Sequence, residues 1–106
     1  RDSVASRGLG DVYKRQYVMS KQIYRCGTSI GANIAESQFA QSDADYINKL
    51  SIALKEAAET IYWLELLHET DLISPKQYES MLNDAKTITG TLVNIVNKIK
   101  NKNNVK

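Results

Sequence analysis

The chain has 106 residues, a formal net charge of +2, 42% hydrophobic and 25% charged side chains, which is the composition of one small globular domain. No apolar run approaches the roughly 18 residues that a membrane-spanning helix needs, and no signal-peptide pattern is present. A single cysteine and a single histidine exclude a disulfide within one chain and leave little for metal or triad chemistry. We therefore expect a small cytoplasmic protein rather than a multidomain enzyme.

The positive charge lies at the two ends of the chain. Residues 1–16 account for the whole net charge of +2, whereas residues 17–93 carry six basic and ten acidic side chains. The last residues contain four unopposed lysines: Lys98, Lys100, Lys102 and Lys106. A nucleic-acid-binding domain usually concentrates basic side chains on one face, and the body of this chain has no such concentration. The terminal lysines are the candidate nucleic-acid contacts, although lysine- and asparagine-rich ends are more often simply solvated.

Residues 1–16, RDSVASRGLGDVYKRQ, have scattered apolar positions, two nearby glycines and no sustained helical period. The pattern predicts a disordered or non-native segment, and it resembles adapter-derived sequence translated at the ends of assembled environmental DNA fragments. We expect the folded domain at residues 17–100, followed by a disordered basic tail at residues 101–106.

The first expected helix runs over residues 20–39, with Ser20 as its N-cap. Its apolar stripe is thin and includes Gly27, and Gly31 lies in the same helix among other small residues. A glycine inside a helix costs about 1 kcal/mol relative to alanine. We expect the close approach of a neighbouring helix backbone to compensate for this cost, because no strand and no GK[ST] sequence accompany the glycines as in a phosphate-binding loop.

Two further helices are expected over residues 43–69 and 75–100. A heptad seam of apolar spacing defines each of them, and Ser74-Pro75 gives the last helix a capping residue followed by proline at its first position. The seams are formed by Ile47, Leu50, Leu54, Ala57, Ile61, Leu64 and His68, and by Tyr78, Met81 or Leu82, Ala85, Ile88, Leu92, Ile95 and Ile99. The sequence therefore predicts an all-α, antiparallel, up-and-down helical bundle.

Two stretches carry a family resemblance: RCGTSIGANIAE at residues 25–36 and LSIALKEAAETIYWLELL at residues 50–67. Together they closely resemble the bacterial four-helix bundle protein family. That family includes proteins encoded by intervening sequences in large-subunit ribosomal RNA genes and accessory variability determinants of diversity-generating retroelements. The resemblance covers residues 17–100.

The resemblance implies a four-helix bundle that assembles as a ring-like homo-oligomer, a pentamer, with no known enzymatic activity and no cofactor. It also implies nucleic acid and a reverse transcriptase as partners of the accessory relatives. Family members carry a further amphipathic helix before the segment that begins here at Tyr17, so we expect that this native first helix is missing and that the surface it covers is exposed.

A polar motif in the first expected helix is the leading candidate site. Arg25, Ser29 and Glu36 lie near one helix face, because offsets of 4 and 11 residues return to within about 40°. The expected role is a polar network within the bundle or between subunits that fixes helix register, in preference to ligand binding. The candidate residues are Arg25, Thr28, Ser29, Asn33 and Glu36, with Glu56 or Glu59 as the carboxylate that Arg25 pairs with on another helix.

Three catalytic or binding alternatives have weaker support. Glu65 and His68 form one E-x-x-H, but a di-iron bundle needs two, so we expect no metal. Cys26 is expected to be a buried packing residue without a catalytic base. The aromatic residues Tyr46, Tyr62 and Trp63 could stack on bases, yet at helical spacing they are more often core or interface residues.

The sequence therefore favours a non-enzymatic helical bundle that acts as a homo-oligomeric assembly or scaffold. The alternative is a nucleic-acid-binding accessory protein, in which a fivefold ring would gather about twenty terminal lysines into one basic rim. No membrane and no small-molecule substrate is expected as a partner.

Overall fold

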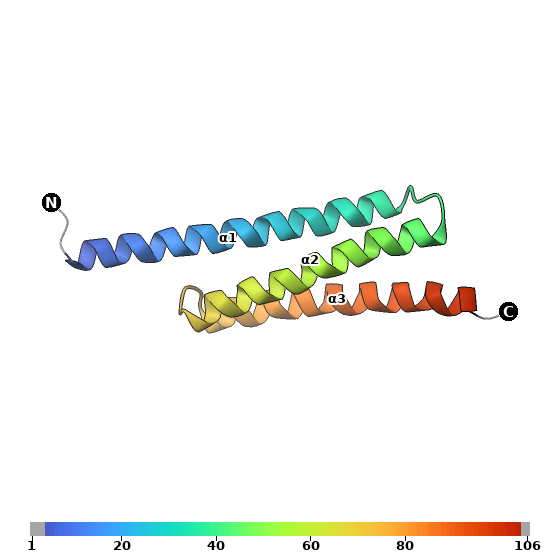
Figure 1. Cartoon of the computed structure of the whole chain (residues 1–106). Helices are drawn as coiled ribbons and strands as arrows, with labels where there is room; N and C mark the ends of the chain where they lie inside the picture. Colours follow the sequence, from blue (N-terminus) through green and yellow to red (C-terminus); the bar gives the residue numbers. More distant parts are fainter. Residues whose placement is uncertain (1–3, 105–106) are drawn as a thin grey trace.

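The computed structural model of the chain describes residues 4–104, which form three helices in the order α1 (Val4–Ser37), α2 (Asp43–Glu69) and α3 (Pro75–Asn104). Each helix runs antiparallel to the one before it (Figure 1). α2 is the central element, because α1 and α3 each pack against α2, while the backbones of α1 and α3 lie farther apart among the described residues. The predicted all-α class is confirmed, and the described part of the chain contains no strand.

The core lies along the middle of α2. Its buried residues come from all three helices: Ile30, Leu50, Ala53, Ala57, Leu92 and Val96. Full burial of one large aliphatic side chain contributes roughly 1.5–3 kcal/mol, so burial of this cluster helps to hold the three helices together. Small alanines at the centre of α2 allow the two outer helices to approach it closely.

Each of the two loops ends in a residue that caps the helix after it. The Ser42 hydroxyl accepts a hydrogen bond from the Asp45 amide at 3.1 Å and caps α2. Ser74 and Gln77 form a reciprocal capping box ahead of α3: the Gln77 amide donates to the Ser74 hydroxyl at 3.1 Å, and the Ser74 amide donates to the Gln77 side chain at 3.2 Å. α2 begins and ends at the residues that the sequence predicts.

The two outer helices are longer than the sequence predicts. α1 begins at Val4 rather than at Ser20, so Ser20 is not an N-cap and most of the segment expected to be disordered is helical. α1 extends past the turn between α2 and α3 (Figure 1). α3 continues to Asn104, so residues 101–104 of the expected tail are helical as well. Once a helix is nucleated by packing, each added residue gains a hydrogen bond, and neither segment contains proline.

The expected close approach at the glycines is wrong for a single copy of the chain. A Cβ atom built on Gly27 or on Gly31 meets no atom within 4 Å. The cost of the two glycines in the middle of α1 is therefore not offset by packing within the described residues.

Candidate functional site

A polar cluster lies where α1 crosses the second half of α2. α1 supplies Arg25 and Cys26, and α2 supplies Glu56, Glu59 and Trp63. The three α2 residues are spaced by three and four positions, so the helix places them on one face toward α1. The cluster therefore joins two segments about thirty residues apart in the sequence.

Glu59 is the common acceptor of this cluster. Its Oε2 atom accepts hydrogen bonds from the Cys26 thiol at 3.1 Å and from the Trp63 indole N–H at 3.2 Å, and it also accepts from Nη2 of Arg25. Arg25 in addition lies 3.4 Å from Oε2 of Glu56 and donates through Nε to Gln22 at 3.0 Å. The guanidinium of Arg25 is thus engaged by side chains of its own chain.

The cluster shifts the pKa of two of its members in opposite directions. Burial raises the pKa of the Cys26 thiol to about 12, and donation to the Glu59 carboxylate adds to the rise. The hydrogen bond from Cys26, and then that from Trp63, lower the pKa of Glu59, with a further contribution from the Arg25 charge. At neutral pH the site therefore holds a protonated thiol and an ionised carboxylate.

The other residues of the predicted polar motif make different contacts. Thr28 donates to the carbonyl of Tyr24, and Asn33 donates to the carbonyl of Ser29 at 2.9 Å, so these three stay within α1. Glu36 pairs with Lys49 of α2 at 3.1 Å. The structure thus brings Arg25 together with Glu56 and Glu59, whereas Thr28, Ser29 and Asn33 do not join that cluster.

The cluster also contains the residues best placed to hold a metal ion in the described part of the chain. One ligand atom each from Cys26, Glu56 and Glu59 lies within 4.8 Å of the others. A cation there would have to displace the Arg25 guanidinium and deprotonate a thiol whose pKa is about 12. The donor set fits a hydrogen-bonded link between helices better than a metal centre.

The same thiol is poorly suited to nucleophilic catalysis. Cys26 has no exposed surface, and its hydrogen-bond partner is a carboxylate, which keeps the thiol protonated. His68 lies in the last turn of α2, where its ring stacks on Tyr78 of α3 with centroids 4.0 Å apart. Cys26 and His68 therefore have different neighbours and form no nucleophile and base pair.

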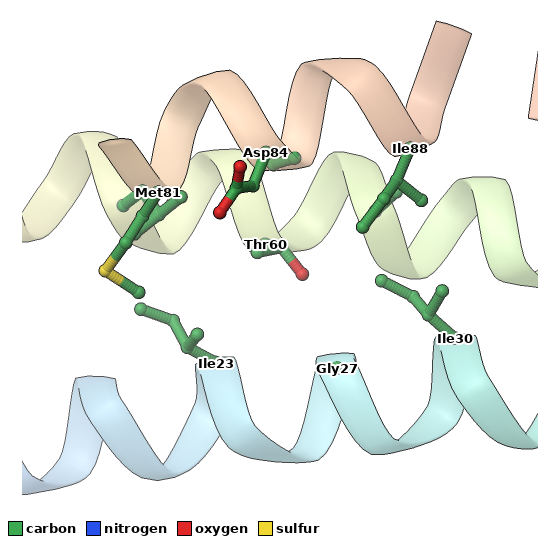
Figure 2. A pocket seen from close by; sticks show the side chains of 10 residues that line it. Ile23, Gly27, Ile30, Thr60, Met81, Asp84 and Ile88 are labelled. Carbon is green, nitrogen blue, oxygen red and sulfur yellow. The ribbon is translucent and has the colours of Figure 1, made fainter. Parts of the chain in front are cut away.

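An apolar groove runs between α1 and α3, with α2 as its floor. Its volume is about 190 Å³. Ile23 faces Met81 and Ile30 faces Ile88 across it, and Asp84 and Thr60 are its polar side chains (Figure 2). Met81 and Ile88 are each 40% exposed, although the predicted seam of α3 includes Ile88 and offers Met81 as an alternative to Leu82. We call this feature the α1–α3 groove.

The exposed apolar surface is expected from the sequence, but its location between α1 and α3 is not, and sequence reasoning misses part of the polar cluster. Trp63 follows Glu59 by one helical turn, so the spacing alone could have indicated their hydrogen bond. Nothing in the sequence indicates which seam positions of α3 stay uncovered, because that depends on where α1 lies. Tyr46 packs against the core and Trp63 is half-buried, whereas Tyr62 is 55% exposed and contacts Trp63 edge to face.

The terminal lysines are placed on the final turns of α3. Lys98, Lys100 and Lys102 are exposed, and Lys106 lies outside the described residues. Helical geometry puts Lys98 and Lys102 on one side, since they are one turn apart, and Lys100 on the other. No helix among residues 4–104 is both long enough and apolar enough to cross a bilayer.

Fold and site together define a helical-bundle protein whose polar cluster joins neighbouring helices. The chain belongs to the 23S rRNA-intervening sequence protein family, whose model matches residues 11–94. This confirms the resemblance and extends it, because residues 11–16 lie inside the match although the sequence analysis assigns them to a non-native segment.

A solved structure supports the same assignment. The chain is similar to a protein of unknown function from the S23 ribosomal protein family of Bacteroides thetaiotaomicron, with 63% sequence identity and a TM-score of 0.73. The similarity covers 74% of this chain and 73% of that one. No curated protein matches the chain.

Proposed function

We propose that this protein is a non-enzymatic helical bundle that acts as a homo-oligomeric scaffold. The observation that carries the proposal is the α1–α3 groove, which leaves apolar side chains of two long helices without a neighbour among residues 4–104. Burying such a surface against another chain is favourable by about 25 cal/mol for each Å² removed from water. The open space at Gly27, which lines the groove, and at Gly31 gives further support, because close packing of a partner would offset the cost of these glycines.

The test is the mass of the protein in solution, measured by light scattering over a hundredfold range of concentration. We expect a defined mass above that of the 11.9 kDa chain, falling on dilution. A monodisperse monomer at every concentration would overturn the scaffold proposal. The family resemblance favours a ring of five copies, and the same mass measurement tests that number.

The second candidate function is nucleic-acid binding. Its specific support is the exposure of Lys98, Lys100 and Lys102 near the end of α3, where an assembly would repeat them once for each copy. Binding through these lysines predicts that affinity for single-stranded RNA falls steeply with salt, because each neutralised phosphate releases a counterion.

A triple Lys→Gln variant at positions 98, 100 and 102 should reduce both the affinity and the salt slope. A matched triple variant at Lys55, Lys76 and Lys86, which are exposed elsewhere on α2 and α3, should leave both unchanged. Absence of binding at low salt would overturn this candidate function. A reverse transcriptase partner is a further prediction of the resemblance, and co-purification with such an enzyme tests it.

A further inference from the structure

A second exposed surface lies on the outer side of α1. We call it the basic face, and it comprises Tyr17, Lys21, Tyr24 and Thr28, all of which are exposed. These residues follow at offsets of 4, 7 and 11, so each lies within about 40° of the first around the helix. Tyr17 is 67% exposed and Tyr24 is 77% exposed. Two large aromatic side chains in water on one helix face indicate a contact surface.

α2 carries a matching exposed surface, which we call the acidic face. It comprises Ala58, Tyr62, Glu65 and Glu69, which repeat the offsets of 4, 7 and 11 and are all exposed. Its aromatic residue, Tyr62, is 55% exposed. No residue of either face lines the α1–α3 groove, so a contact between the two faces leaves the groove free for another helix.

The two faces are opposite in charge. Residues 13–34 of α1 contain four basic side chains and no acidic one, whereas residues 56–69 of α2 contain four acidic side chains and neither lysine nor arginine. The charged members of the faces, Lys21, Glu65 and Glu69, take part in no ion pair among the described residues. A contact between two basic faces or two acidic faces places like charges together, so the favourable contact joins the basic face of one copy to the acidic face of another.

The packing of α1 on α2 sets which residues of the two faces lie at one level along the bundle. Cys26 contacts Glu59 and the two helices are antiparallel (Figure 1), so each step back along α1 corresponds to one step forward along α2. Lys21 lies five residues before Cys26 and Glu65 lies six residues after Glu59, which puts the two at nearly the same level. Copies related by rotation about an axis along the helices keep these levels, so Lys21 of one copy can reach Glu65 of the next.

We propose that the basic face of α1 in one copy packs against the acidic face of α2 in the next copy, with Lys21 of the first beside Glu65 of the second. By the same relation, Tyr24 of the first copy lies level with Tyr62 of the second, so an aromatic pair accompanies the charge pair. The contact is heterologous, and it closes into a ring when the rotation permits. The inference rests on the proposed scaffold function, and it names the surfaces that join the copies.

The test is a charge exchange followed by sedimentation equilibrium. The single variants Lys21→Glu and Glu65→Lys should each weaken association about tenfold, because each places like charges in the contact. An equal mixture of the two variants should associate more strongly than either alone, since each copy then meets an opposite charge on its neighbour. Lys86→Glu and Glu79→Lys, at exposed positions of α3, are the matched controls: they change the net charge equally and should leave association unchanged.

An aromatic substitution supplies a second test that does not depend on charge. Tyr24→Ala should weaken association about tenfold, because aromatic side chains supply much of the binding free energy of protein interfaces. Phe39→Ala is the matched control. Phe39 is 84% exposed in the turn between α1 and α2 and belongs to neither face, so its removal should leave association unchanged.

The outcomes separate the inference from the function on which it rests. A wild-type chain that stays monomeric overturns the scaffold proposal and the contact inference together. A wild-type chain that assembles, with association unaltered by Lys21→Glu, Glu65→Lys and Tyr24→Ala, overturns the contact inference alone. Weaker association of the single variants without any gain in their mixture also overturns it, because Lys21 and Glu65 then do not face each other between copies.

Discussion

The thiol of Cys26 donates a hydrogen bond to Oε2 of Glu59 across the contact between α1 and α2, at 3.1 Å. This bond connects a fully buried side chain to one that lies near the surface, since the Glu59 side chain is 40% exposed. The same oxygen accepts from Trp63 and Arg25, so one carboxylate fixes three donors.

Glu59→Gln should lower the Tm at pH 7 by several degrees, because the uncharged amide oxygen is a weaker acceptor for three donors. The folded-state pKa of Glu59 is below its unfolded value, so its stabilising contribution is present above about pH 4.5 and is lost as the pH falls through the folded pKa. The difference in Tm between the variant and the wild type should therefore become smaller toward pH 2. Thermal unfolding followed by circular dichroism measures both, and Glu65→Gln on the exposed side of α2 is the control.

The raised pKa of the Cys26 thiol predicts that the protein loses stability at alkaline pH. Its folded-state pKa, about 12, is higher than the ordinary value of 9.0, so the folded state retains a proton that the unfolded state releases. The contribution is complete below about pH 9 and decreases as the pH rises toward 12. Denaturant titrations from pH 8 to pH 11 should show a steeper decline for wild type than for Cys26→Ala. Equal slopes would contradict the burial of the thiol.

Arg25→Ala tests whether the arginine acts within one copy or between copies, the two roles that the sequence leaves open. Because Arg25 binds Glu56 and Glu59 of its own chain, we expect the free energy of unfolding to fall by roughly 0.2–1 kcal/mol, as for exposed ion pairs. The oligomer mass at fixed concentration should be unchanged. A lower mass together with an unaltered unfolding free energy would place Arg25 at a subunit interface instead.

Ser74→Ala should lower the free energy of unfolding by about 1 kcal/mol, because Ser74 caps α3 and exchanges two hydrogen bonds with Gln77. Urea titration at neutral pH measures the change. Ser80→Ala, at an exposed position early in α3, is the matched control. Alanine at this position should raise the free energy of unfolding slightly. A Ser74→Ala chain as stable as wild type would show that α3 is fixed by packing alone.

Local sequence features determined most of the architecture. Ser42, Ser74 and Pro75 mark the helix starts by side-chain hydrogen bonds and a fixed backbone angle, which act over a few residues and can be read directly. The seam of α2 is equally local, because its spacing of three and four residues repeats over about six turns. The pairing of Arg25 with Glu56 or Glu59 could be anticipated for a related reason: opposite charges on facing helices come close when both helices are long and antiparallel.

The ends of α1 and α3 could not be predicted from local sequence features. Residues 4–16 lack an apolar period, and that pattern predicts disorder when the segment is considered alone. As a continuation of a helix already held by Ile30 and Cys26, the same residues need only propagate existing structure, which is far less costly than nucleation. The start of α1 therefore depends on contacts elsewhere along the helix rather than on a local apolar period.

The sequence by itself determined the all-α class, the course of α2, the capping of α3 and the family, because capping, helical period and motif spacing are properties of adjacent residues. Only the tertiary structure decided that Cys26, Trp63 and Arg25 share one acceptor and that Met81 and Ile88 stay partly in water. Those outcomes depend on how α1 and α3 are placed about α2. An apolar period shows that a helix face needs a partner, but the distances between helices determine which part of that face receives one.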